Sequence, residues 1–165
     1  MHVMTDTAAR LFKPEDPASC TCANLRKAAR AVTQAFDTAL QPSGLRATQF
    51  TVLATLAKRG ELPLMKLAEA MVLDRTTLTR NLRPLIDRGL VRETRDEDRR
   101  VRRLGLTRAG AAALETALPY WHQAQGRLVA ALGPGRWAEL LGDLAETLEA
   151  VRGPNRASAG EPQGP

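Results

Sequence analysis

Apolar residues recur at the three- and four-residue spacing of a helix in six stretches of the chain. The predicted helices cover residues 20–40, 47–58, 65–71, 74–88, 108–132 and about 137–151. Residues 90–95 and 101–106 instead alternate apolar with polar side chains, which predicts two short strands and a hairpin. The segment 62–64 is too short for an independent strand and could pair only as an edge beside that hairpin. The pattern therefore indicates a mainly α protein with a small β-hairpin.

Residues that suit helix starts precede several of these stretches. Asp74 can act as an N-cap, because its carboxylate can accept a hydrogen bond from the amide of Thr77. Other candidates are Ser19 or Thr21 for the first helix, Thr48 near the start of the second and Thr107 for the helix at 108.

Glycine and proline mark the expected ends and bends. Gly89 suits the end of the helix at 74–88, and residues 133–135 (Gly-Pro-Gly) are expected to separate the last two helices. Pro84 and Pro119 lie inside helical patterns that continue beyond them. Each removes one backbone hydrogen bond, so we expect a bend or a loosened turn there.

The helices at 65–71 and 74–88, joined by a tight turn at Val72-Leu73, form a predicted helix-turn-helix. The second helix buries a stripe of leucines and presents a polar face to the outside. Such a helix can offer side chains to the major groove, and an arginine-tipped hairpin can reach phosphates or the minor groove. The polar face consists of Arg75, Thr76, Thr79, Arg80 and Arg83.

Positive charge is concentrated in this region. The formal net charge is +6, and the isoelectric point near 10.1 suggests nucleic acid or an anionic surface as partner. Residues 74–108 hold eleven arginines against six acidic residues, so they carry +5 of that total. A solvated basic face is the simpler alternative, but the confinement of this charge to one helix and one hairpin favours a DNA-binding surface.

Individual contacts can be assigned as expectations. Arg80 is the best candidate for a base edge, since bidentate arginine to guanine is the commonest specific contact. Thr76 and Thr77 could meet phosphate or a thymine methyl, although Thr77 could instead cap the helix, and Arg83 could be merely solvated. Thr48 and Gln49, at a predicted helix N-terminus, suit backbone phosphates.

The long helices at about 20–41 and 108–152 carry more apolar surface than the small centre can cover. We therefore expect a two-fold dimer in which these helices of both chains intertwine. Residues 1–17 have no helical period and are expected to form a flexible arm, and residues 153–165 a disordered tail. Between them, residues 18–152 are expected to form a single domain.

Other functions have little support. The only histidines are His2 and His122, and no nucleophile elbow, phosphate loop or zinc-protease helix is present, so neither enzyme activity nor a cofactor is expected. No apolar run approaches the roughly 18 residues that span a bilayer, and the N-terminus lacks a secretory signal. These features favour a soluble, cytoplasmic protein.

Cys20 and Cys22 are the only cysteines. Side chains so close in sequence rarely achieve disulfide geometry, so reduced thiols in a reducing compartment are expected. A redox switch or a share in a metal site remains an alternative, although two ligands alone do not complete a tetrahedral site.

Three runs of residues resemble the MarR family of bacterial transcription regulators: LRATQFTVLATL at 45–56, DRTTLTRNLRPLIDRGLV at 74–91 and DEDRRVRRLGLTRAG at 96–110. The resemblance covers roughly residues 45–150, and the last two runs together are specific. It implies a winged helix-turn-helix at about 45–108, flanked by dimerisation helices. A homodimer of this kind binds a palindromic operator in double-stranded DNA, usually as a repressor.

The resemblance also assigns roles in the wing and in an effector site. The family's Asp and Arg of the wing fall on Asp98 and Arg100, with Arg99 and Arg102 as further expected DNA contacts. Members commonly have Arg-Asp where this chain has Glu97-Asp98, so one basic residue is missing and Arg102 and Arg103 could compensate. Effectors often lie between the dimerisation helices and the DNA-binding lobe. Our candidates there, for a small aromatic acid or phenol, are Phe36, Trp121 and His122.

Two alternatives remain at this stage. One keeps DNA binding but replaces the small-molecule effector with thiol oxidation or metal binding at Cys20 and Cys22. The other, from a different class, is a winged-helix module that binds protein and not DNA; the basic helix and hairpin argue against it.

Overall fold

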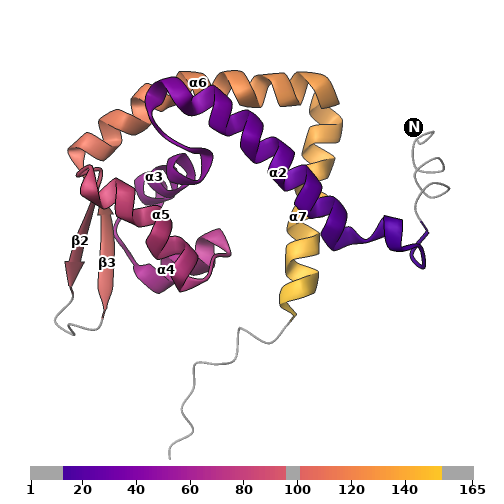
Figure 1. The fold of residues 1–165 in the computed structure, drawn as a ribbon, viewed down its shortest axis with the longest axis horizontal. Coiled ribbons are helices and arrows are strands. Elements are labelled where there is room, and N and C mark those ends of the chain that lie inside the picture. Colours follow the sequence, from indigo (N-terminus) through magenta and orange to yellow (C-terminus); the bar gives the residue numbers. More distant parts are fainter. Residues whose placement is uncertain (1–12, 96–100, 154–165) are drawn as a thin grey trace, which may run out of the picture. The chain divides into compact units, whose positions relative to one another are not determined.

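The computed structural model describes residues 13–95 and 101–153 (Figure 1). The predicted arm up to residue 12, the wing residues Asp98, Arg99 and Arg100, and the tail from residue 154 lie outside the described residues. In chain order the elements are η1 (Pro17–Ser19), α2 (Thr21–Leu40), η2 (Gln41–Ser43), α3 (Ala47–Arg59), β1 (Leu62–Pro63), α4 (Leu64–Met71), α5 (Arg75–Asp87), β2 (Val91–Arg95), β3 (Arg102–Leu106), α6 (Arg108–Leu132) and α7 (Pro134–Arg152).

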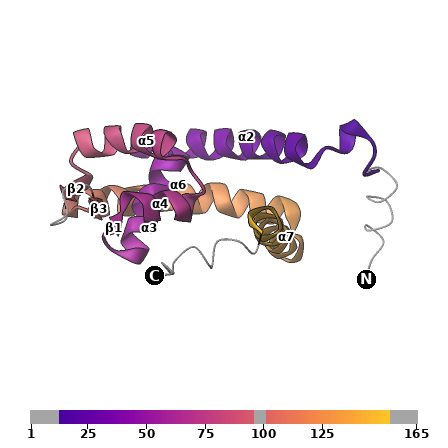
Figure 2. The ribbon, with the colours of Figure 1, turned by 90° about the horizontal axis from the view of Figure 1, so that it is seen from below.

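The three strands form one antiparallel sheet in the order β1-β3-β2. In the hairpin, Val91 pairs with Leu106 and Arg95 with Arg102, while β1 adds only Leu62 and Pro63 to the other side of β3. The prediction that residues 62–64 could pair only as an edge is therefore confirmed. Figures 1 and 2 place this sheet beside the helices α3, α4 and α5.

Leucine dominates the core of the winged helix, and aromatic residues make up only 4% of the chain. The buried stripe of α5 packs with α3 and α4 against the inner face of the sheet. Because this stripe points inward, the polar face of α5 is left outside. The side chains buried most completely are Leu40, Leu53, Leu56, Leu67, Leu78, Leu82, Leu85, Leu104, Val52 and Val91.

The chain divides into two compact units, residues 1–124 and 125–165. The first contains the winged helix, α2 and most of α6. The second contains the end of α6 and the whole of α7. No residue of α7 is buried. Among the described residues, no helix is both long and apolar enough to cross a membrane.

Two predicted helix caps are confirmed. Asp74 Oδ1 accepts a hydrogen bond from the Thr77 amide at 2.8 Å, and Thr107 Oγ1 accepts one from the Gly110 amide at 2.9 Å. The predicted turn at residues 72–73 is also present, with Val72 in the left-handed region (φ 53°). Helix α5 continues through Pro84 to Asp87 and ends before Gly89.

The predicted caps of the first two helices and the predicted start of the last helix are wrong. The residue before α2 is Cys20, which makes no side-chain cap. At α3, Thr48 does not cap; Asp37 Oδ1, ten residues away, accepts from the Ala47 amide at 2.7 Å. Helix α7 begins at Pro134 rather than near 137, since proline at the first helical position forfeits no hydrogen bond.

Candidate nucleic-acid interface

The polar face of α5 forms one side of an open groove. Its lining residues enclose about 880 Å³ and come from α5 and from the first residue of β3. The face predicted from sequence is thereby brought together with one wing arginine. The lining residues are Arg75, Thr76, Thr79, Arg80, Arg83, Pro84, Asp87 and Arg102.

Positive charge in this groove is only partly neutralised. Among the described residues, Arg75 and Arg80 form no ion pair, and both side chains are exposed. Arg83 Nε lies 3.8 Å from Asp87 Oδ2, but both side chains are largely in solvent, so that pair is weak. The groove can therefore offer guanidinium groups to phosphates or to base edges.

Arg102 is held in place by a carboxylate of the neighbouring strand. Its Nε and Nη2 donate to Glu93 Oε1 and Oε2 at 2.7 and 2.6 Å, and this pairing raises the pKa of Arg102. Both side chains are about three-quarters buried. A bidentate pair uses two of the five N–H donors of arginine, so Arg102 is oriented and keeps further donors.

Three other predicted contacts do not line the groove. The hydroxyl of Thr77 donates to Asp74 Oδ2 at 2.6 Å, and this hydrogen bond is the main reason that the pKa of Asp74 is lowered. Gln49 Oε1 accepts from the Arg46 amide at 3.0 Å. Thr48 and Gln49 are half-buried at the start of α3. Thr77 and Gln49 thus serve helix starts.

A second, apolar cavity lies between α2, α3 and α6. It encloses about 200 Å³ and is lined by Val32, Thr33, Phe36, Leu40, Ala47, Phe50, Thr51 and Trp121. The rings of Phe50 and Trp121 stack with centroids 5.7 Å apart. Phe36 and Trp121 are brought together as predicted. His122 packs edge-on against Trp121 at 5.2 Å but does not line the cavity.

Cys20 and Cys22 are both exposed and unpaired by disulfide. Within residues 13–95 and 101–153, no three histidine, cysteine or acidic side chains gather where they could hold a metal ion. Within the described part of the chain, no further side chain therefore joins Cys20 and Cys22 in a metal site.

Sequence reasoning missed the carboxylates that bind the wing arginines. Glu93 pairs with Arg102, and Glu61 pairs with Arg92 and Arg103. The hairpin register was the available signal: Glu93 lies opposite Leu104, so it shares a face with Arg102, two residues earlier on β3. No comparable signal existed for Glu61, which precedes a two-residue strand.

A helix-turn-helix that packs on a leucine core, a three-stranded sheet and an arginine-lined outer groove together define a winged helix-turn-helix DNA-binding protein. The model of the MarR family matches residues 45–101. With a relative of known structure 41% identical over nearly its full length, the chain belongs to the MarR family. Its members are DNA-binding transcriptional regulators rather than enzymes.

The chain is similar to several solved structures of such regulators. The Mycobacterium tuberculosis regulator MosR in complex with DNA is 41% identical, with a TM-score of 0.70 over 81% of this chain and 98% of that one. Bordetella bronchiseptica BpsR, whose DNA binding is regulated by 6-hydroxynicotinic acid, is 25% identical, with a TM-score of 0.73 over 83% and 99%. Mutant Escherichia coli MarR with operator DNA, at 23% identity and a TM-score of 0.70 over 77% and 92%, shares the fold. No curated protein sequence matched.

Proposed function

We propose that this regulator is a homodimeric repressor that binds a palindromic operator and is released by a small aromatic effector. The observation that carries the proposal is the groove beside α5, where Arg75 and Arg80 lack carboxylate partners among the described residues. Arg80 reads a base edge, Thr76 and Thr79 meet the backbone or a thymine methyl, and Arg102 clamps a phosphate. The proposed set is completed by Thr48, Gln49, Arg75, Thr77, Arg83, Asp98, Arg99 and Arg100.

Unpartnered apolar faces support the homodimer. Helix α2 buries only Leu40 of its 20 residues and exposes Leu25 and Val32, while α7 exposes five apolar side chains. A two-fold dimer of these helices covers both faces and presents two recognition helices. Their spacing must be about 34–36 Å to meet successive turns of the major groove, which makes the operator a palindrome.

Arg80→Ala tests the readout. The substitution should weaken operator binding by roughly 1–3 kcal/mol and relax the preference at one position per half-site, because a bidentate contact to guanine is lost. Selection from random DNA measures the preference, and titration measures the affinity. Arg136→Ala, which removes the same charge from α7, is the control and should change neither. An unaltered preference in the Arg80 variant would show that Arg80 reads no base.

The apolar cavity supports the aromatic effector. Its volume of about 200 Å³ suffices for one ring, since an apolar cavity of about 150 Å³ can hold benzene. The DNA binding of BpsR responds to 6-hydroxynicotinic acid, a ring of this size. We infer that Phe36 and Trp121 form the walls of the site and that His122 supports Trp121 from behind.

Thr51→Phe tests this site by filling the cavity. It should leave operator affinity nearly unchanged and raise the concentration of 6-hydroxynicotinic acid needed for release by about tenfold or more, a loss of at least about 1.4 kcal/mol. Thr55→Phe, one turn further along α3 and outside the cavity, should respond like the parent protein in the same gel-shift titration. Release by peroxide or by a zinc chelator, with no response to aromatic acids, would instead support the sensor at Cys20 and Cys22.

A further inference from the structure

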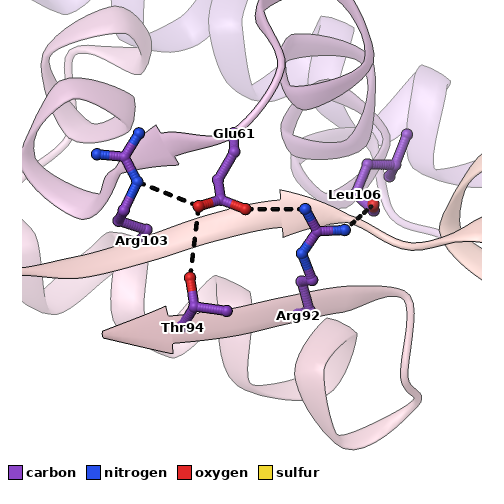
Figure 3. Close-up of polar contacts among 5 residues, drawn as sticks. All are labelled: Glu61, Arg92, Thr94, Arg103 and Leu106. Carbon is purple, nitrogen blue, oxygen red and sulfur yellow. Dashed lines mark hydrogen bonds and ion pairs between the residues drawn. The ribbon is translucent and has the colours of Figure 1, made fainter. Parts of the chain in front are cut away.

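Glu61 stands at the junction of α3 and β1 and contacts both strands of the hairpin (Figure 3). Its Oε2 accepts from Arg92 Nη2 of β2 at 2.8 Å. Its Oε1 accepts from Arg103 Nε of β3 at 3.1 Å and from the Thr94 hydroxyl at 3.4 Å. One carboxylate outside the hairpin thus connects its two strands to the rest of the winged helix.

Gly105 makes room for this cluster. It is the register partner of Arg92, and a Cβ placed there would lie 3.0 Å from Arg92 Cζ and 3.1 Å from Glu61 Oε2. The guanidinium therefore lies across β3 at the one position without a side chain. Arg92 Nη1 also donates to the carbonyl of Leu106, the next residue of β3, at 3.5 Å. This hydrogen bond is a second restraint on the guanidinium.

The backbone connection of the hairpin to the winged helix is short on this side. β1 contributes two residues to the sheet, and one of them, Pro63, has no N–H to donate. Side-chain hydrogen bonds from Glu61 can therefore contribute much of the connection at this edge. Isolated surface ion pairs contribute little, but a carboxylate shared between two arginines that pack on the sheet is a network.

The cluster is not a pH switch in the neutral range. Hydrogen bonds from Arg92 and then Arg103 hold the pKa of Glu61 below its ordinary value of 4.5. A group whose folded pKa is depressed stabilises the fold above its unfolded pKa and loses that effect as pH falls through the folded pKa. The carboxylate is therefore ionised at every pH at which DNA binding would ordinarily be measured.

We propose that Glu61 is a positioning residue for the wing, which fixes the direction of the hairpin without itself touching DNA. The inference rests on the proposed function, in that the wing must contact DNA for its direction to matter. The opposite account is that Glu61 only repels phosphate. The two accounts predict opposite signs, because losing a repulsive charge tightens DNA binding and losing a support weakens it.

Glu61→Ala separates them, with Glu69→Gln as the control that removes one carboxylate from α4, where it pairs with Lys66. Amide hydrogen exchange in β2 and β3 is measured without DNA, and operator affinity by titration. We expect faster exchange confined to the hairpin and roughly fivefold weaker operator binding, about 1 kcal/mol, in a protein that stays folded. The control should match the parent in both measurements. Glu61→Gln, which keeps an acceptor oxygen, should restore part of the affinity.

A double-mutant cycle with Arg100→Ala links the effect to the wing. If Glu61 acts by placing the wing, Arg100→Ala costs less affinity in the Glu61→Ala protein than in the parent; independent effects would add. Additive losses, unchanged hairpin exchange or tighter operator binding would each overturn the positioning role. A different result separates this proposal from the proposed function. If Arg100→Ala and Arg80→Ala leave DNA binding intact, the proposed DNA contacts are wrong. Faster exchange of the hairpin in Glu61→Ala would still show that Glu61 holds the hairpin in place.

Discussion

Leu144→Asp should abolish the folded protein and operator binding together. Helix α7 has 19 residues and none of them is buried within the chain, yet most of the stability of helices in proteins comes from packing an amphipathic face. Its apolar side chains need a partner surface, which the proposed homodimer supplies. The exposed apolar residues of α7 are Leu140, Leu141, Leu144, Leu148 and Val151.

The expected size of the effect follows from the kind of interface. Intertwined dimers typically bury 2,000 Å² or more with a core-like interior. At about 25 cal/mol per Å², that is tens of kcal/mol of gross hydrophobic stabilisation before entropy is subtracted. An aspartate in the middle of the stripe loses the burial of one leucine and adds an unpaired buried charge, twice in a two-fold dimer. Dissociation and unfolding should therefore coincide.

Light scattering and circular dichroism at micromolar concentration measure both outcomes. Ala150→Asp is the matched control, because it adds the same charge to the acidic face of α7. Glu146 and Asp143 lie one and two helical turns before it on that face. That variant should remain a folded dimer that binds the operator. A stable, folded monomer of 17.9 kDa in the parent protein would contradict the dimer.

Local signals in the sequence predicted most of the elements. The leucine spacing of α5 placed its buried stripe, and the face opposite that stripe is the one that lines the groove. The Asp74 cap could be predicted because donor and acceptor are three residues apart. Both results rest on the period of one helix, which needs no knowledge of the rest of the fold.

Interactions between distant segments could not be read in this way. Asp37 caps α3 across a gap of ten residues, and Glu61 reaches Arg103 across 42. A count of charges treats every arginine of the hairpin as available for DNA. The structure instead pairs Arg92, Arg102 and Arg103 with carboxylates. Formal charge therefore overstated the positive charge that the wing strands present, and the unpaired charge of the described groove lies on α5.

Gly110 is another residue whose role no pattern revealed. Helix α6 starts directly against the backbone at the beginning of β2. The Thr107 amide donates to the Leu90 carbonyl at 3.2 Å, and the Thr107 hydroxyl donates to the Gly89 carbonyl at 2.7 Å. A Cβ on Gly110 would lie 2.0 Å from Leu90 O and 2.8 Å from Leu106 Cδ1, so helix and strand could not keep this approach.

We therefore expect Gly110→Ala to lower the free energy of unfolding by about 2–3 kcal/mol. Overpacking a core costs typically 1–3 kcal/mol, and here the obstructing atom is backbone, which cannot move as a flexible side chain can. Straining the Thr107 hydrogen bonds adds roughly 0.5–1.5 kcal/mol each. The preference for alanine over glycine within a helix returns only about 1 kcal/mol. Operator binding should fall as well, because Leu90 leads into the wing strand.

Gly126→Ala in the same helix is the matched control. A Cβ there meets nothing within 4 Å in the chain, so only the helix preference remains, and stability should rise by up to about 1 kcal/mol. Urea unfolding of both variants at one fixed protein concentration gives the comparison, since the stability of a dimer depends on concentration. A Gly110→Ala protein as stable as the parent would mean that α6 does not approach Leu90 so closely. A loss of stability confined to Gly110→Ala would show that the missing side chain at Gly110 is what lets α6 pack against the backbone at the base of the wing.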